Sequence, residues 1–257
     1  MNLKSILFTI IILVLFIILF RYIFKDVHGI QNGIVNGQTP SVVSASSLSE
    51  NSNSNNFAYS VWFYVNDWNY RYGEPKVIYG RMGKSSANGG GSIDNINGLD
   101  PCPAVVLGAI ENNLSIALGC YPGLDSNTTA TPITGQATSV VHTCNVANVP
   151  IQKWVNLLIS VYGRTLDVYI DGKLVKTCLL PGIAMVNQNA DVFITPKGGF
   201  SGWTSKFQYW ANSLNPQDAW NIYTQGYGGS ILGNLFGSYE VQVSVLENGT
   251  TTSSIKI

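Results

Sequence analysis

Two carboxylates lie close together in the sequence, at a spacing that invites comparison with glycoside hydrolysis. Asp167 and Asp171 flank Tyr169 in the alternating segment TLDVYID. At roughly 3.3 Å per residue along a strand, the two aspartate Cα atoms would lie about 13 Å apart. Glycoside hydrolysis needs two carboxyl groups about 5 to 9.5 Å apart, and short aspartate side chains do not close that gap. The pair therefore does not predict a catalytic site.

Other catalytic groups are scarce. The chain has 257 residues and two histidines, His28 and His142, which leaves no Ser/His/Asp constellation and no metal-binding cluster. Charged residues make up 11% of the chain and its formal net charge is zero, so the sequence lacks the basic surface typical of nucleic-acid binding. We expect no catalytic residue, no metal site and no nucleic-acid partner.

Aromatic residues are better candidates for a functional site. Trp68 and Tyr70 lie in the loop NDWNYRYGEP, and Tyr162 and Tyr169 lie in a hairpin further along the chain. Exposed aromatic side chains bind sugars and protein partners, but the same residue types also pack loops and strands against a domain. Both interpretations stay open for these four residues.

The hairpin belongs to residues 154–178, the segment around which the chain is organised. Gly163-Arg164 and Asp171-Gly172 are two-residue turn signals between runs rich in Val, Ile, Leu and Tyr, which predicts three antiparallel strands. We expect Tyr162 to lie opposite Thr165. This register places six apolar residues on one face: Leu157, Ile159, Val161, Leu166, Val168 and Ile170.

The second turn extends the pattern. Closing it with Ile170 opposite Lys173 adds Val175 to the apolar face. The same register sets Asp167 opposite Lys176, where unlike charges attract. A slip of one residue would scatter the apolar face, so the register is well specified.

The segment VYGRTLDVYIDGKLV, with Trp154 ahead of it, resembles the core hairpins of the concanavalin A-like lectin/glucanase superfamily and its laminin-G-like (LamG) domains. The later segment GFSGWTSKFQYWANSLNPQDAWNIYTQG is similar to the superfamily's closing strand and short helix. The resemblance covers residues 57–229 and implies an all-β fold, an antiparallel two-sheet jelly-roll β-sandwich. Such families include carbohydrate binders, protein-binding modules and glycosidases with an E-x-D-x-E-like strand. Related modules can bind Ca²⁺ at loop ends, but no dense acidic cluster is present, so no cofactor is expected.

The short helix is also indicated by its ends. Asn215 as N-cap, Pro216 at the first helical position and Gly226 after the last turn predict about ten helical residues. Three of them would face the domain: Ala219, Ile222 and Tyr223. Residues 230–257 predict a C-terminal hairpin extension, which either adds to the edge of the sandwich or pairs with a neighbouring molecule.

Four cysteines, with no C-x-x-C motif, are more typical of two disulfides than of a zinc site. Cys102 and Cys120 are equidistant from Glu111, the expected turn of a hairpin, which favours a bridge between them. Cys144 and Cys178 are then left for each other, although four cysteines allow three connectivities.

Residues 1–25 predict a transmembrane anchor. Residues 5–24 are almost continuously apolar, about the length needed to cross a bilayer. A cleaved signal peptide is the alternative, but no A-x-A-like site follows the run. Residues 26–56 are rich in Ser and Asn and predict a stalk, or poorly ordered chain without a spacing role. The cysteines favour a single-pass membrane protein whose C-terminal domain is non-cytosolic or inside a virus particle.

Three N-x-[ST] sequons are candidates for N-glycosylation in a secretory lumen: Asn113, Asn127 and Asn248. Taken together, the sequence favours a membrane-anchored, non-catalytic, lectin-like domain that binds a glycan or protein ligand, with Tyr162 and Tyr169 on the hairpin face opposite the aliphatic one. The runner-up is a structural protein that ties a membrane to the capsid of a large DNA virus particle, because an anchor, stalk and lectin-like head in an Asn-rich chain resembles such proteins in style. A glycoside hydrolase is a minor alternative.

Overall fold

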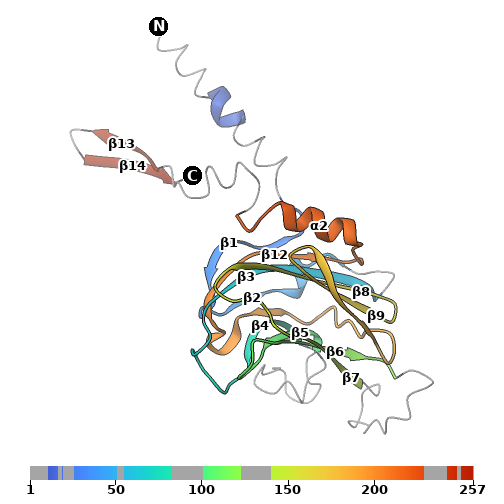
Figure 1. The fold of residues 1–257 in the computed structure, drawn as a ribbon. Helices are drawn as coiled ribbons and strands as arrows, with labels where there is room; N and C mark the ends of the chain where they lie inside the picture. Colours follow the sequence, from blue (N-terminus) through green and yellow to red (C-terminus); the bar gives the residue numbers. More distant parts are fainter. Residues whose placement is uncertain are drawn as a thin grey trace.

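The computed structural model describes residues 11–16, 19, 26–50, 55–82, 101–122, 140–228, 242–247 and 250–256. Two six-stranded antiparallel sheets pack face to face (Figure 1). Sheet A has the strand order β1 (Gly29–Asn36), β12 (Ser201–Trp210), β3 (Phe57–Asp67), β8 (Trp154–Tyr162), β9 (Thr165–Ile170) and β10 (Lys173–Leu179). Sheet B has the order β2 (Ser41–Val43), β11 (Val192–Ile194), β4 (Lys76–Met82), β5 (Pro101–Leu107), β6 (Leu114–Cys120) and β7 (Val140–Val146). The predicted all-β, antiparallel two-sheet sandwich is confirmed.

The core lies between the two sheets and follows the alternation of the strands. In β3, Tyr59 and Phe63 point inward and are at most 1% exposed. The Tyr59 ring meets the rings of Tyr79 in sheet B and Tyr209 in β12, at centroid distances of 5.4 and 4.8 Å. Each such side chain contributes about 1.5–3 kcal/mol through burial, so the strands that hold it are fixed firmly.

The predicted register of β8 and β9 is confirmed. Tyr162 lies opposite Thr165, and Leu157 lies opposite Ile170. The apolar residues of both strands therefore enter the core together, as the alternation of the sequence indicates.

The predicted register of β10 is wrong beyond its first pairs. A bulge after Leu174 inserts one extra residue, so Asp167 lies opposite Thr177 rather than Lys176. The Thr177 hydroxyl donates a hydrogen bond to the Asp167 carboxylate at 2.6 Å. Val175 does not join the apolar face and is 47% exposed.

The interpretation of residues 26–56 as a stalk is also wrong. β1 pairs with β12 and β2 pairs with β11, so this segment supplies an edge strand to each sheet. Leu48 follows the 3-10 helix η1 (Ala45–Ser47) and is buried in the core. An edge strand pairs along one side only and needs few apolar side chains, which explains why the composition did not reveal it. Residues 51–54 lie outside the described part.

The predicted anchor lies largely outside the described residues. Residues 11–16 are helical and exposed. Among the described residues, we find no helix that is both long and apolar enough to span a bilayer.

The predicted short helix is confirmed as α2 (Pro216–Thr224), and it lies over part of the outer face of sheet A (Figure 1). The Asn215 side chain accepts a hydrogen bond from the Asp218 N–H at 2.9 Å, and the Asp218 carboxylate accepts one from the Asn215 N–H at 3.0 Å. This capping box starts the helix. Ala219 and Ile222 are buried, as expected.

The C-terminal hairpin forms from β13 (Gln242–Glu247) and β14 (Thr250–Lys256). The two strands pair with each other in a separate two-stranded sheet. Within the described part of the chain, neither strand belongs to sheet A or sheet B.

The Cys144–Cys178 disulfide is confirmed. It joins β7 to β10, the edge strands of the two sheets, with a Cα separation of 6.1 Å. It therefore closes one side of the sandwich covalently.

The predicted Cys102–Cys120 bridge is wrong, because both residues are buried thiols. Ala104 lies opposite Ala117, and continuing this register sets Cys102 level with Gly119. The hairpin is centred half a residue earlier than the sequence indicated, so the two cysteines are not directly opposed. Burial raises the pKa of the Cys120 thiol to about 11.

Candidate functional site

The two hairpin tyrosines do not form one surface. Tyr169 is 1% exposed and packs beneath α2, in a cluster with Leu158, Ala219 and Ile222. Tyr162 is 67% exposed at the end of β8. Of the two interpretations left open for Tyr169, packing is the one that its position supports, because the helix covers this part of sheet A.

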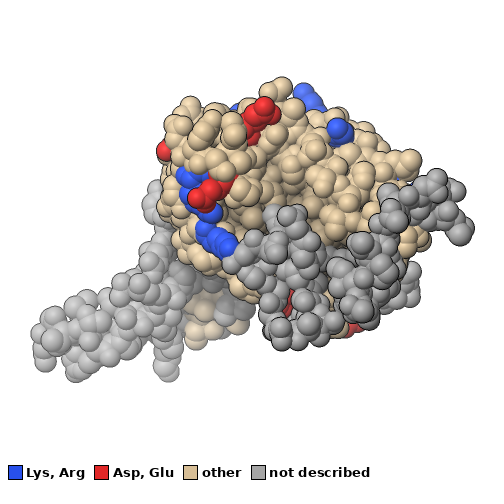
Figure 2. Space-filling model, turned by 90° about the horizontal axis from the view of Figure 1, so that it is seen from below, with Lys and Arg blue, Asp and Glu red and all other residues tan. Residues whose placement is uncertain are grey.

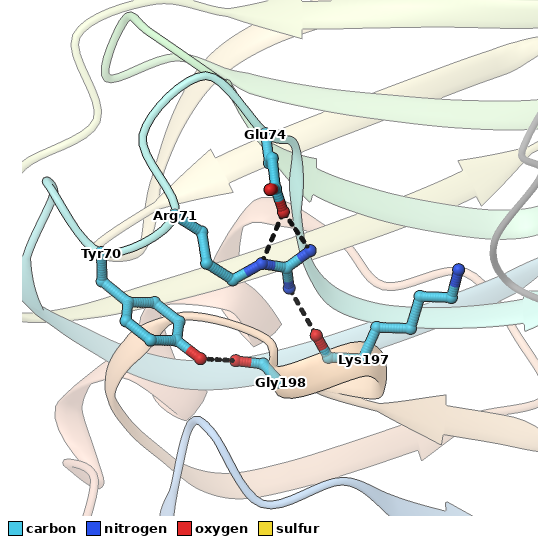
Figure 3. A network of polar contacts seen from close by, with 5 residues as sticks. All are labelled: Tyr70, Arg71, Glu74, Lys197 and Gly198. Carbon is cyan, nitrogen blue, oxygen red and sulfur yellow. Dashed lines mark hydrogen bonds and ion pairs between the residues drawn. The ribbon is translucent and has the colours of Figure 1, made fainter.

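The two loop aromatics hold the loop against the domain. Trp68 donates a hydrogen bond from Nε1 to the Ile110 carbonyl at 2.9 Å, and its ring lies over the Lys76 ammonium, 4.8 Å from Nζ. The Tyr70 hydroxyl donates to the Gly198 carbonyl at 3.1 Å (Figure 3). Both side chains thus have packing roles, the second of the two interpretations for this loop.

Arg71 reinforces the same loop. Its guanidinium forms an ion pair with Glu74 at 2.7 Å and donates a second hydrogen bond to the Lys197 carbonyl (Figure 3). Lys197 belongs to the short helix η3 (Pro196–Gly198), which leads into β12. Burial lowers the pKa of the nearby Lys76, and the positive charge of Arg71 lowers it further. The polar groups of this network are engaged in holding the loop in place.

Three aromatic side chains from three neighbouring strands form a partly exposed row on the outer face of sheet A. Trp203 in β12 lies opposite Tyr64 in β3, and Tyr64 lies opposite Trp154 in β8. The ring centroids are 5.5 Å apart between Trp203 and Tyr64 and 5.8 Å apart between Tyr64 and Trp154. Trp203 is 39% exposed. We call these three residues the aromatic row.

A glycine lets β12 approach β3 at the aromatic row. Gly202 has φ +154°, and a Cβ at this position would lie 1.8 Å from the Tyr64 carbonyl oxygen. No side chain fits in that space, so glycine is required where the chain sets Trp203 beside Tyr64.

The segment after α2 borders the aromatic row. The Tyr227 ring stacks on the Trp154 ring at a centroid distance of 4.4 Å and an interplanar angle of 11°. The Tyr227 carbonyl accepts a hydrogen bond from the Ser205 hydroxyl at 2.7 Å, and the Tyr227 side chain is 39% exposed. Two exposed polar residues, Asn66 in β3 and Gln152 just before β8, flank the row. The arrangement combines exposed aromatic rings with nearby amide groups, which suits binding rather than bond cleavage.

The two aspartates of the hairpin are engaged in structural contacts. Asp167 accepts its hydrogen bond from Thr177. Asp171 accepts one from the Asn156 N–H at 3.0 Å and forms an ion pair with Lys153 at 2.9 Å. Among the described residues, no group of three His, Cys, Asp or Glu side chains is placed to hold a metal ion. The His28 ring lies 5.1 Å from the Trp210 ring, and His142 lies in β7.

A hollow of about 370 Å³ lies elsewhere, beside β10. Its lining comes from the loop after β7 and from the hairpin of β9 and β10, and includes Val149, Ile170 and Val175. Lys176 is its one charged lining residue, so the hollow offers no pair of catalytic groups. On the side of the molecule opposite α2, the described surface carries scattered charges and no extended patch of one sign (Figure 2).

One of the three sequons can be placed. Asn113 lies half-buried in the turn before β6, with its side-chain oxygen over Gly108: a Cβ added to that glycine would lie 1.9 Å from Oδ1. Asn127 and Asn248 lie outside the described residues.

No family model and no curated protein matches the chain. Among solved structures, it is similar to three botulinum neurotoxin domains. These are the receptor-binding domain of the C/D mosaic serotype (TM-score 0.48, 13% identity, covering 74% of this chain and 41% of that one), the receptor-binding domain of serotype D (0.47, 12%, 76% and 42%) and the binding domain of serotype D/C VPI 5993 (0.49, 15%, 75% and 43%). The chain thus spans about two fifths of the length of these structures. Its assignment as a β-sandwich rests on its own strand pairing.

The aromatic row and Tyr227 were not among the residues that the sequence predicted for a functional site. Alternation in FAYSVWFYV sets Tyr64 on the face of its strand opposite Tyr59 and Phe63, a signal that the sequence carries. The sequence carries no signal that Tyr64 lies close to Trp154 and Trp203, because this proximity depends on which strands become neighbours in the sheet.

Proposed function

We propose that this chain is a non-catalytic binding protein that recognises carbohydrate through the aromatic row. The observation that carries the proposal is the lateral alignment of Trp203, Tyr64 and Trp154 on the outer face, beside the part that α2 covers. Aromatic rings present flat apolar surface at low entropic cost, which suits the apolar faces of sugar rings. Asn66 and Gln152 would then hydrogen-bond to sugar hydroxyls at the margin of the row.

We also propose that residues 5–24 anchor the chain in a bilayer as a single pass, with the sandwich on the non-cytosolic side or inside a virus particle. The support is the apolar length of the segment and the disulfide between β7 and β10, since disulfides persist in oxidising surroundings. A laminin-G-like ancestry fits the same organisation.

The test is binding of the full chain, held in detergent micelles, to an array of neutral and charged glycans. Trp203→Ala should weaken binding about tenfold or more, because truncating a central aromatic anchor removes a large share of the contact energy. Tyr162→Ala is the matched control: it removes an aromatic side chain that is 67% exposed but lies outside the row, and binding should be unchanged.

Failure has two forms. Absence of binding to every glycan would reject carbohydrate recognition and favour the structural role between a membrane and a capsid. Equal binding by the Trp203→Ala and wild-type chains would reject the aromatic row as the site.

A further inference from the structure

The polar segment after the apolar run is folded into the sandwich, and this removes the spacer between anchor and domain. The apolar run ends at Phe24, and Lys25 alone separates it from Asp26. The Asp26 carboxylate accepts a hydrogen bond from Gln208 in β12, and β1 begins at Gly29. An anchor at residues 5–24 would therefore hold the sandwich within a residue or two of the bilayer surface.

The chain reaches the sandwich on the side that carries α2. Gln208 lies opposite Ser60, on the outer face of sheet A. The His28 ring lies 5.1 Å from the ring of Trp210, which packs against the cluster beneath α2. Burial lowers the pKa of Lys206, and the negative charge of Asp26 partly offsets this effect. The Lys206 ammonium donates a hydrogen bond to the Gln225 side chain just after the helix. These contacts place residues 26–28 on the same face as α2 and the aromatic row.

Around α2, the exposed side of this face is rich in uncharged and aromatic residues. The exposed residues of α2 and its C-cap carry no charge: Pro216, Gln217, Trp220, Asn221, Thr224 and Gln225. Trp220 is 44% exposed, and Trp203 and Tyr227 are each 39% exposed. Val27, next to the point where the chain joins the sandwich, is 79% exposed. Trp and Tyr side chains favour the headgroup region, where one part of the ring system is apolar and the other can hydrogen-bond.

We infer that the outer face of sheet A, with α2 and the aromatic row, lies against the bilayer that holds the anchor. This inference rests on the anchor of the proposed function. The occupant of the face is a lipid surface, because the tether is too short to carry the face away from it. The aromatic row then lies at the level of the lipid headgroups. The glycan that it binds belongs to the same membrane rather than to an opposing surface.

The experiment is photo-crosslinking of the full chain in phosphatidylcholine vesicles. A benzophenone amino acid replaces Trp220 on α2 or, as the matched control, Ile110, which is 60% exposed in the turn between β5 and β6 of sheet B. Lipid adducts are then identified by mass. We expect adducts at position 220 and none at position 110. A Gly/Ser linker of about 20 residues between Lys25 and Asp26, with an r.m.s. length of roughly 25 Å, should remove most of the adduct at position 220.

The outcomes separate this inference from the proposed function. A chain that does not float with the vesicles would reject the anchor. A chain that floats but gives equal or no adducts at the two positions would reject the apposed face while leaving the anchor in place. Adducts at position 220 that persist with the linker would overturn the tether argument.

Discussion

Two regions of the outer face of sheet A hold tyrosine side chains in different surroundings. In one region, Tyr169 of β9 is 1% exposed under α2 and packs against Ala219 and Ile222. In the other region, Tyr64 of β3 stands in the aromatic row and is partly exposed. The residue type is the same in both places. The role of an aromatic side chain on this sheet therefore depends on whether α2 lies above it.

The position of α2 is set by a close fit at the turn between β9 and β10. Gly172 has φ +73°, and a Cβ there would lie 3.0 Å from the Tyr223 Cβ and 3.1 Å from the Trp220 ring. The helix thus rests directly on the turn. The segment that follows α2 stacks Tyr227 on Trp154, between the region that α2 covers and the aromatic row.

The largest effect on stability is expected in the region that α2 covers. Tyr169→Ala should lower the free energy of unfolding by about 3–5 kcal/mol, because it removes a buried aromatic ring and leaves a cavity beneath α2. Tyr162→Ala removes the same ring from an exposed site and should change stability by less than about 0.5 kcal/mol. Urea denaturation of both variants measures the difference. Equal effects would show that burial under α2 does not distinguish the two tyrosines.

The fit of the helix on the turn can be tested next. Gly172→Ala should lower the free energy of unfolding by about 2 kcal/mol, because it adds backbone strain at positive φ and a close contact with α2. Gly163→Ala is the control, because Gly163 has φ +57° with no atom within 4 Å of the added Cβ. The Gly163→Ala variant has the backbone strain alone, so its free energy of unfolding should fall by less. If both variants are equally destabilised in urea, the contact with α2 contributes nothing.

The cap of the helix should matter less. Asn215→Ala removes the capping box and should destabilise the protein by about 1 kcal/mol. The exposed Asn212, three residues earlier, provides a neutral comparison when replaced by alanine. Thermal unfolding followed by circular dichroism would reveal the difference, and an unchanged midpoint for Asn215→Ala would contradict the importance of the cap.

The smallest effect is expected from pH. Burial raises the pKa of Tyr169 above its usual value, and the negative charge of Asp167 raises it further. The folded state therefore favours the protonated phenol. Its contribution to stability is complete below the unfolded pKa of about 10 and is lost as pH rises through the higher folded pKa. Tyr169→Phe should slightly reduce the fall in the free energy of unfolding as pH rises above about 10, whereas Tyr162→Phe should leave this fall unchanged.

The sequence by itself determined the local elements of this protein. The pairing of Tyr162 with Thr165, the apolar face of β8 and β9 and both ends of α2 were predictable, because turn residues, caps and two-residue alternation act over a few neighbouring positions. The Cys144–Cys178 disulfide also followed, but only by elimination, after a pairing of Cys102 with Cys120 that the structure contradicts.

Only the tertiary structure decided the features on which function depends. The bulge after Leu174 shifted β10, and edge pairing made strands of a segment that looked like a stalk. Docking of α2 buried Tyr169, while the order of strands in sheet A brought Tyr64, Trp154 and Trp203 into one row. These outcomes depend on backbone hydrogen bonds and packing between residues far apart in the chain, and such contacts leave no periodic signal in the local sequence.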